Sequence, residues 1–298
     1  MAGHLSERAA LIHAVRDFFI RNGYLEVQTP IRLPCLIPEA HIDPFESETW
    51  FLHASPELCM KRLMAKGHER IFQICQCFRK HERGTRHLPE HTLLEWYAEG
   101  MNYHDLMETL NSLIRHVADL TGKGSVLEYQ GAKVEITEEL HKLQVKDAFS
   151  KYGTLGMEKA LESGRFDEII SLDIEPCLGT DRPVFLYDFP ASLGALARLK
   201  PENPEFAERF ECYIAGLELA NGFSELTDPK EQRSRFEKEI SRRAGMNKSS
   251  ARMPEKFLRD LSDMPDCAGA ALGIDRLVML FNNLDSIDDA VAFTPEDL

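Results

Sequence analysis

The sequence has 298 residues, of which 43% are hydrophobic, enough for one large packed domain or two small ones. No apolar run reaches the roughly 18 residues that a membrane span needs, and the N-terminus lacks the features of a signal peptide. We therefore expect a cytoplasmic protein. The formal net charge of −14 argues against extensive nucleic-acid contact, because phosphates are bound mainly by Lys and Arg.

The first half of the chain mixes helical and strand patterns. Apolar residues at helical spacing predict a helix that Ser6 caps and Gly23 ends, and a short strand follows over residues 24–27. An apolar run over residues 71–78 leads into a polar, basic loop over 79–89 and a strand over 92–98. Helical patterns cover 103–120, 137–150 and 155–171, and we expect the last two to form a small inserted helical layer.

Strand patterns return in the second half, over residues 185–189, 206–214 and 217–223. A charged helix begins at Asp228-Pro229, a cap and first-turn pair, and residues 246–256 read as a loop. A strand of small residues over 268–274 leads into a final helix from about Asp275. Because the elements mix without βαβ regularity, the sequence predicts an α+β fold with a mainly antiparallel sheet.

The cysteine pattern does not predict a metal or disulfide framework. Seven cysteines are present, and none belongs to a CxxC pair. Cys75 and Cys77 lie two residues apart in an apolar run, which is typical of core cysteines on one strand face.

The strand over 92–98 places polar groups on one face. Leu94 and Trp96 share the apolar face, so Glu95 and Tyr97 face a cavity or solvent. This pattern fits a half-exposed strand, or a carboxylate and a phenol that together bind an ammonium group.

A hairpin carries the second acidic pattern. A two-residue turn at residues 215–216 pairs Tyr213 with Glu218 and puts Glu211 diagonally across from Glu218, roughly 7–8 Å away. Two carboxylates at that distance repel unless a cation lies between them, and hard oxygen ligands favour Mg²⁺. With a possible bulge at Gly222, the same site is also faced by Asn221, Phe223 and Glu225. The alternative is an acidic, solvated hairpin.

Two basic features favour a polyphosphate ligand. The loop over 79–89 collects four basic residues and two histidines, and Arg side chains bind phosphate oxygens bidentately. Arg276 stands in the first turn of the final helix, whose N-terminus already favours anions. Taken alone, the loop is equally consistent with an ordinary surface loop.

Together these segments resemble the three signature motifs of class II aminoacyl-tRNA synthetases. The first helix and the strand ending at Pro30 resemble motif 1, which builds a dimer interface in that family; residues 78–97 resemble motif 2 and residues 268–276 motif 3. The resemblance implies one catalytic domain over 1–298, with a small helical insertion around 137–171, and a homodimer.

Within this class, three segments are similar to lysyl-tRNA synthetases: HASPE at 53–57, MKRL at 60–63 and ELANGFSEL at 218–226. The resemblance is closer still to a family of short relatives, the elongation factor P–(R)-β-lysine ligases, and extends from about Glu7 to the C-terminus. It implies that ATP activates lysine or (R)-β-lysine as an acyl-adenylate, and that the acyl group passes to a lysine of elongation factor P.

The resemblance also implies roles for individual residues. Catalysis would rest on positioning and charge neutralisation by Arg79 and Arg276. The Mg²⁺ ligands would be Glu211 and Glu218. The implied ATP-binding residues are Arg79, Glu82, His87, His91, Glu211 and Arg276. The implied amino-acid-binding residues are Ser55, Glu57, Glu95, Tyr97, Asn221, Phe223, Glu225 and Ala271. Among these, Glu57 and Glu95 would receive the amino group near the reacting carboxylate, and Tyr97 and Glu225 the side-chain ammonium.

Several features separate this chain from lysyl-tRNA synthetases. The first helix begins close to Met1, so we expect no N-terminal OB-fold for reading an anticodon and no tRNA acceptor. Ala271 stands where those synthetases usually carry glycine, and its methyl group would suit an isomer with a displaced amino group. His81 replaces the usual Glu of motif 2, and His91 replaces a Phe that stacks on adenine. Two alternatives stay open: a non-catalytic regulator that binds an amino acid or nucleotide, and a freestanding lysyl-tRNA synthetase-like aminoacylase.

Overall fold

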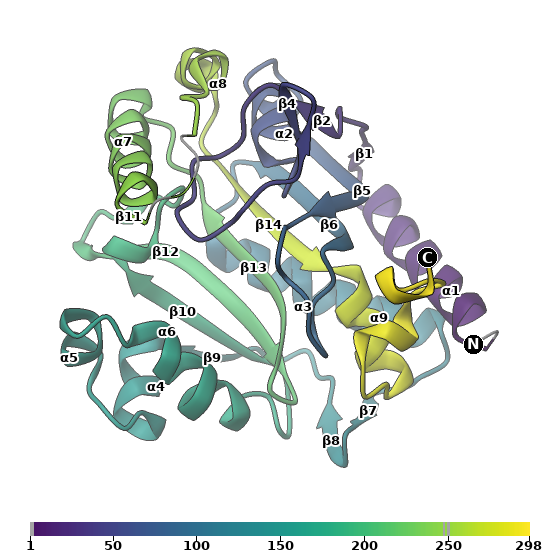
Figure 1. The fold of residues 1–298 in the computed structure, drawn as a ribbon. Helices are drawn as coiled ribbons and strands as arrows, with labels where there is room; N and C mark the ends of the chain where they lie inside the picture. The colour runs from purple at the N-terminus through teal and green to yellow at the C-terminus, as the bar shows by residue number, and fades with distance from the viewer. Residues whose placement is uncertain (1–2, 247, 249–250) are drawn as a thin grey trace.

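The computed structural model describes residues 3–246, 248 and 251–298. In this part of the chain a nine-stranded sheet has the order β1-β5-β6-β14-β13-β12-β10-β9, with β11 paired to β12 (Figure 1). Only the β1–β5 and β9–β10 pairs are parallel. The α+β fold with a mainly antiparallel sheet is therefore confirmed. The strands are β1 (Leu25–Glu26), β5 (Arg70–Phe78), β6 (Glu90–Glu99), β9 (His141–Gln144), β10 (Val184–Pro190), β11 (Leu199–Lys200), β12 (Asn203–Ile214), β13 (Leu217–Ser224) and β14 (Cys267–Gly273).

Three helices cover one face of the sheet: α1 (Gly3–Arg21), α3 (Tyr103–Leu120) and α9 (Ile274–Asn282) (Figure 1). The main core lies between them and the strands, where Phe19 of α1 stacks on Phe72 of β5 with ring centroids 5.0 Å apart. Trp96 is fully buried in the same core. Helix α1 begins at Gly3, so Ser6 lies inside the helix and the predicted cap there is wrong. No helix among the described residues is both long and apolar enough to cross a membrane.

Shorter elements build up the other face and its rim. They are α2 (Glu57–Met64), α7 (Pro229–Gly245), α8 (Glu255–Asp260) and a small sheet of β2 (Arg32–Leu33), β3 (Glu46–Ser47) and β4 (Trp50–Leu52). A separate apolar cluster, which includes Met60, Phe236 and Phe257, joins helices α2, α7 and α8. Asp228 caps α7, as predicted, by accepting hydrogen bonds from the amides of Lys230 and Glu231. A hairpin of β7 (Val126–Tyr129) and β8 (Ala132–Glu135) lies beyond α3.

The segment predicted as two helices over 137–150 and 155–171 is only partly helical. Residues 141–144 form β9, because the open edge of β10 offers hydrogen bonds that a helix there would leave unused. The helices are α4 (Val145–Tyr152), α5 (Met157–Glu162) and α6 (Phe166–Ile169). Gly164, at φ +67°, makes the turn between the last two. Phe149 stacks on Phe166 with centroids 4.8 Å apart, so these helices share an apolar cluster of their own.

Candidate active site

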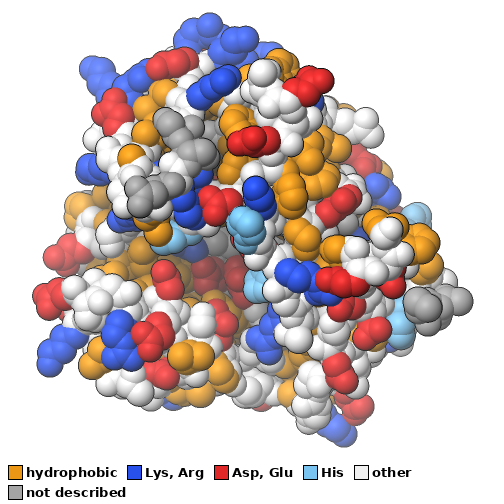
Figure 2. All heavy atoms as spheres, in the orientation of Figure 1, with side chains coloured by type: hydrophobic (Ala, Val, Ile, Leu, Met, Phe, Trp, Pro, Cys, Tyr) orange, Lys and Arg blue, Asp and Glu red, His pale blue; other side chains and the backbone are white. Residues whose placement is uncertain are grey.

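A cavity of about 630 Å³ opens on the face of the sheet opposite α1 and α3. Figure 2 shows acidic and histidine side chains gathered around a hollow in the middle of this face. Thirteen of the residues predicted from the sequence line the cavity: Ser55, Glu57, Arg79, Glu82, His87, His91, Glu95, Tyr97, Glu218, Asn221, Phe223, Ala271 and Arg276. The two other predicted residues, Glu211 and Glu225, are buried behind that lining.

The floor of the cavity is strand β14, which lies between β6 and β13. Ala271 is half-buried and has Glu95 as its partner on one side and Asn221 on the other. Two residues earlier, a Cβ on Gly269 would lie 2.2 Å from the ring of Tyr97. Residue 269 must therefore be glycine, whereas Ala268, Ala270 and Leu272 of the same strand belong to the main core.

Glu95 and Tyr97 face the cavity, as the strand pattern predicted. Ser55 donates a hydrogen bond of 2.5 Å to one oxygen of Glu95, and the Tyr97 hydroxyl donates one of 3.2 Å to the other. Burial, with a contribution from the nearby Glu57 carboxylate, raises the pKa of Glu95 to about 8, although these two hydrogen bonds oppose the shift. A cationic group placed here would restore its charge.

Lys61 is the main site residue to which the sequence reasoning gave no role. Its ammonium lies 2.5 Å from Glu57 and 2.5 Å from Glu225, and 5.0 Å from the ring centroid of Phe223. Burial by itself disfavours the ammonium, but the two carboxylates more than offset it and raise the pKa of Lys61 above its usual value. Glu225, for which the sequence predicts contact with a substrate ammonium, is paired with Lys61 in this structure. The i,i+4 spacing of Glu57 and Lys61 on one helix is the signal that could have revealed the pair.

Arg276 anchors a basic cluster in the first turn of α9. One of its nitrogens lies 2.7 Å from the carbonyl of Glu218 and 3.0 Å from the carboxylate of the same residue. The other terminal nitrogen donates to the imidazole of His87 over 2.6 Å. Burial and the charge of Arg276 lower the pKa of His87, so a neutral imidazole accepts this bond. His87 thus holds the guanidinium in place without competing for an anion.

Arg79 and His91 lie beside this cluster. The Nε of Arg79 is buried and has no hydrogen-bond partner among the described residues, which leaves a donor for an anionic ligand. Burial lowers the pKa of His91 to about 3, and Arg79 contributes to the shift. The imidazole of His91 is therefore uncharged and presents a flat ring to the cavity. His81 lies in the turn that follows Lys80, with φ at +69°.

The acidic hairpin forms with one change from the predicted register. Tyr213 pairs with Glu218 as expected, but a shift next to Cys212 pairs Glu211 with Asn221. The bulge thus lies at Leu219, and the prediction of a bulge at Gly222 is wrong. Gly222 is needed for packing, since a Cβ there would lie 2.7 Å from the ring of Phe210.

Glu211 is a buried carboxylate with two partners. Arg209 lies 2.5 Å from one of its oxygens, and the Tyr213 hydroxyl donates to the other over 2.6 Å. Burial raises the pKa of Glu211 to about 7; Arg209 opposes the shift and Glu218 adds to it. Glu175, which the sequence reasoning missed, accepts a bond of 3.4 Å from the same hydroxyl. Burial and the charge of Glu218 also raise its pKa. The carboxylates of Glu175, Glu211 and Glu218 therefore lie close together on one side of the basic cluster.

Comparisons with known proteins agree with this geometry. The family model of class II tRNA synthetases (D, K and N) matches residues 1–297. An elongation factor P–(R)-β-lysine ligase of Pectobacterium carotovorum is 39% identical, over 98% of this chain and 95% of its own. Those of Vibrio atlanticus and Salmonella gallinarum are each 38% identical, over 97% and 98% of this chain and 94% of theirs. The chain therefore belongs to the class II tRNA synthetase family, within the group of elongation factor P–(R)-β-lysine ligases, and is an ATP-dependent ligase.

Proposed function

We propose that this protein activates lysine or (R)-β-lysine with ATP and transfers the acyl group to a lysine of elongation factor P. One observation carries the proposal: a single cavity joins the carboxylates around Glu95 to the basic cluster around Arg276 across a floor of small residues. A diamino acid complements the first group and a triphosphate the second. The names of the relatives supply the isomer and the acceptor.

At the acidic end, Glu57 and Glu95 receive the amino group near the reacting carboxylate. Ser55 orients Glu95 through its 2.5 Å bond, and Tyr97 meets the side-chain ammonium. Glu225 reaches that ammonium only if its pairing with Lys61 rearranges, so we place it behind the wall of the subsite. Phe223 and Asn221 flank Ala271 along the aliphatic chain. The methyl group of Ala271 narrows the floor between Glu95 and Asn221.

At the basic end, Arg79 binds the α-phosphate through donors that include its unpaired Nε. Arg276, held by His87, binds the outer phosphates. His91 stacks on the adenine as a neutral ring, and Glu82, 3.7 Å from Arg79, contacts the nucleotide beside it. Glu211 and Glu218 are hard oxygen donors whose mutual repulsion a divalent cation would relieve, so they fit Mg²⁺. When bound, Mg²⁺ neutralises phosphate charge.

The reaction needs no protein nucleophile. A carboxylate oxygen of the amino acid attacks the α-phosphorus in line, the bond to the bridging oxygen of the β-phosphate breaks, and pyrophosphate leaves. The amine of the acceptor lysine then attacks the acyl carbon, AMP leaves, and the amide nitrogen gives its proton to solvent. Arg79 and Arg276 act by positioning the phosphates and by stabilising the charge that develops on them.

Mass spectrometry of elongation factor P tests the proposal directly. Incubation with enzyme, ATP and each lysine isomer should raise the mass of the factor by one lysyl group, and ATP–pyrophosphate exchange should depend on the same isomer. Folded enzyme without exchange for either isomer would favour a non-catalytic regulator. Exchange with charging of total tRNA, and no change in the mass of the factor, would favour a freestanding aminoacylase.

We further propose that residues 1–298 act as one catalytic domain with α4, α5 and α6 as an insertion, in the cytoplasm and as a homodimer. Support for a dimer comes from large apolar side chains that stay exposed on α1 and β1, namely Leu5, Ile20 and Leu25. Light scattering during gel filtration tests this: the mass should be twice that of the 33.9 kDa chain, and a monomeric mass contradicts it.

A further inference from the structure

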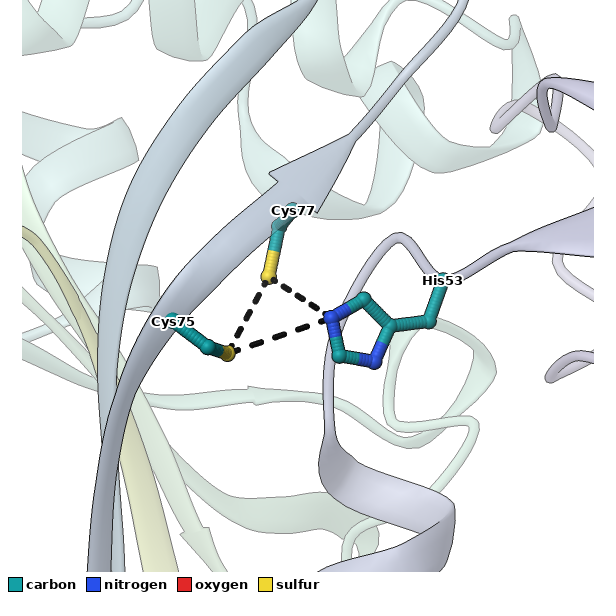
Figure 3. Close-up of side chains that lie close together, drawn as sticks. All are labelled: His53, Cys75 and Cys77. Atoms are coloured by element: carbon teal, nitrogen blue, oxygen red, sulfur yellow. Dashed lines mark hydrogen bonds between the residues drawn. The ribbon is translucent and has the colours of Figure 1, made fainter. Parts of the chain in front are cut away.

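Three potential metal ligands meet beside the active-site cavity. His53 follows strand β4, and Cys75 and Cys77 project from one face of β5 toward its imidazole (Figure 3). The Nε2 atom of His53 lies 3.9 Å from each sulfur, and the two sulfurs are 3.9 Å apart. His53 and Cys77 are fully buried and Cys75 is half-buried. Apolar packing of core cysteines does not require a histidine nitrogen beside both sulfurs. The arrangement therefore calls for another explanation.

The three ligand atoms form an equilateral triangle of the size that a metal ion requires. In tetrahedral geometry an ion above the centre of a triangle with 3.9 Å edges lies about 2.4 Å from each corner. Zinc binds Cys sulfur at about 2.3 Å and His nitrogen at about 2.0–2.1 Å, so the ligand atoms need to move only by a few tenths of an ångström. We propose that His53, Cys75 and Cys77 bind one Zn²⁺ ion. Two thiolates and a neutral imidazole cancel the charge of the ion, which suits a buried position. The fourth position of a tetrahedral site stays open to a small ligand.

A disulfide fits this cluster less well. Residues two apart in a strand have Cα atoms roughly 6.6 Å apart, near the upper limit of the range found for disulfides. The sulfurs would also have to move from 3.9 Å to bonding distance within a paired strand. A metal ion bridges the same atoms with little movement, so the geometry favours metal binding over oxidation.

The metal-free cluster holds protons that zinc must displace. The Nε2 atom of His53 lies 2.8 Å from the carbonyl of Gln76 and donates to it, while Nδ1 is buried with no partner among the described residues. Zinc takes the place of the two thiol protons, which leave to solvent, and of the proton on Nε2, which moves to Nδ1 so that the imidazole stays neutral.

The cluster joins two parts of the active site. His53 lies two residues before Ser55, and Cys77 two residues before Arg79. An ion here ties the segment that binds the amino acid to the strand that presents the phosphate-binding arginine. Zinc binding itself does not depend on the proposed function, and its test needs no substrate.

Cobalt titration of the reduced, chelator-treated full-length protein tests the site. The wild type should bind one equivalent of Co²⁺ with thiolate-to-cobalt charge-transfer bands and d–d bands of tetrahedral intensity, and Zn²⁺ should abolish both. Cys77→Ser should lose the charge-transfer bands. Cys212→Ser, at a buried cysteine outside the cluster, is the matched control and should keep them. One equivalent of Zn²⁺ should raise the melting temperature of the wild type and of Cys212→Ser only.

X-ray absorption of the zinc-loaded wild type keeps the test decisive if Cys77→Ser does not fold. Two sulfurs at about 2.3 Å and one nitrogen at about 2.0 Å support the site. A shell of oxygen and nitrogen alone, octahedral cobalt bands, or equal cobalt binding by wild type and Cys77→Ser would each overturn it.

Discussion

Replacing Lys61 by Met removes a buried ammonium and keeps the length of the side chain. The ammonium holds Glu57 and Glu225 at 2.5 Å each, and the side chains of Lys61 and Glu225 are 1% and 0% exposed. Removing one partner of such a buried pair leaves an uncompensated charge, which costs about 3–5 kcal/mol. Burial raises the pKa of Glu225 to about 8 even with Lys61 present. In Lys61→Met this carboxyl can therefore bind a proton below that pH and avoid a buried charge without a partner. The loss of unfolding free energy should therefore be larger at pH 9 than at pH 6.

A double-mutant cycle measures this effect by urea unfolding. Its four proteins are the wild type, Lys61→Met, Glu225→Gln and the double variant. Glu225→Gln in the Lys61→Met background should recover part of the lost stability, because it removes the charge left without a partner. Arg165→Met is the control for an exposed ion pair with Glu168, and it should cost less than about 1 kcal/mol. If Lys61→Met costs no more than Arg165→Met, or if Glu225→Gln worsens it, then Lys61 does not neutralise these carboxylates.

Three further predictions concern the cavity. Ala271→Gly should shift the ratio of kcat/KM values toward α-lysine by about tenfold, because one methyl group discriminates by roughly 1–3 kcal/mol; unchanged exchange kinetics for both isomers contradict this. Arg276→Lys should lower kcat in pyrophosphate exchange by about 10²-fold, as expected for one lost transition-state contact, with the KM for the amino acid unchanged; a rise in that KM alone would place Arg276 elsewhere. Glu95→Gln should flatten the pH dependence of stability, because burial raises the Glu95 pKa from 4.5 to about 8. The folded state therefore keeps this proton longer, and the wild type should lose stability as pH rises from 4.5 to 8. Urea melts across that range measure the slope, and an equal slope in the variant rules out Glu95 as its source.

The strand patterns predicted much of the sheet and many of the residues that face the cavity. Period-2 alternation over 92–98 was enough to separate Glu95 and Tyr97 from Trp96, because Trp96 has its lowest free energy in the core. The turn at 215–216 set the pairing of Tyr213 with Glu218 for a similarly local reason. The same local reasoning failed at residues 141–144, where a strand edge distant in the sequence supplied the hydrogen bonds.

The sequence by itself therefore determined most strands of the sheet, the fold class and the chemical types of the site residues, since these follow from spacing and from the side chains themselves. Only the tertiary structure decided which groups are partners. It brought Lys61 to Glu225 across 164 positions, moved the bulge from Gly222 to Leu219, and placed His53 against Cys75 and Cys77. Such contacts depend on how strands and helices pack at distances of a few ångströms, and no local periodicity in the chain encodes that packing.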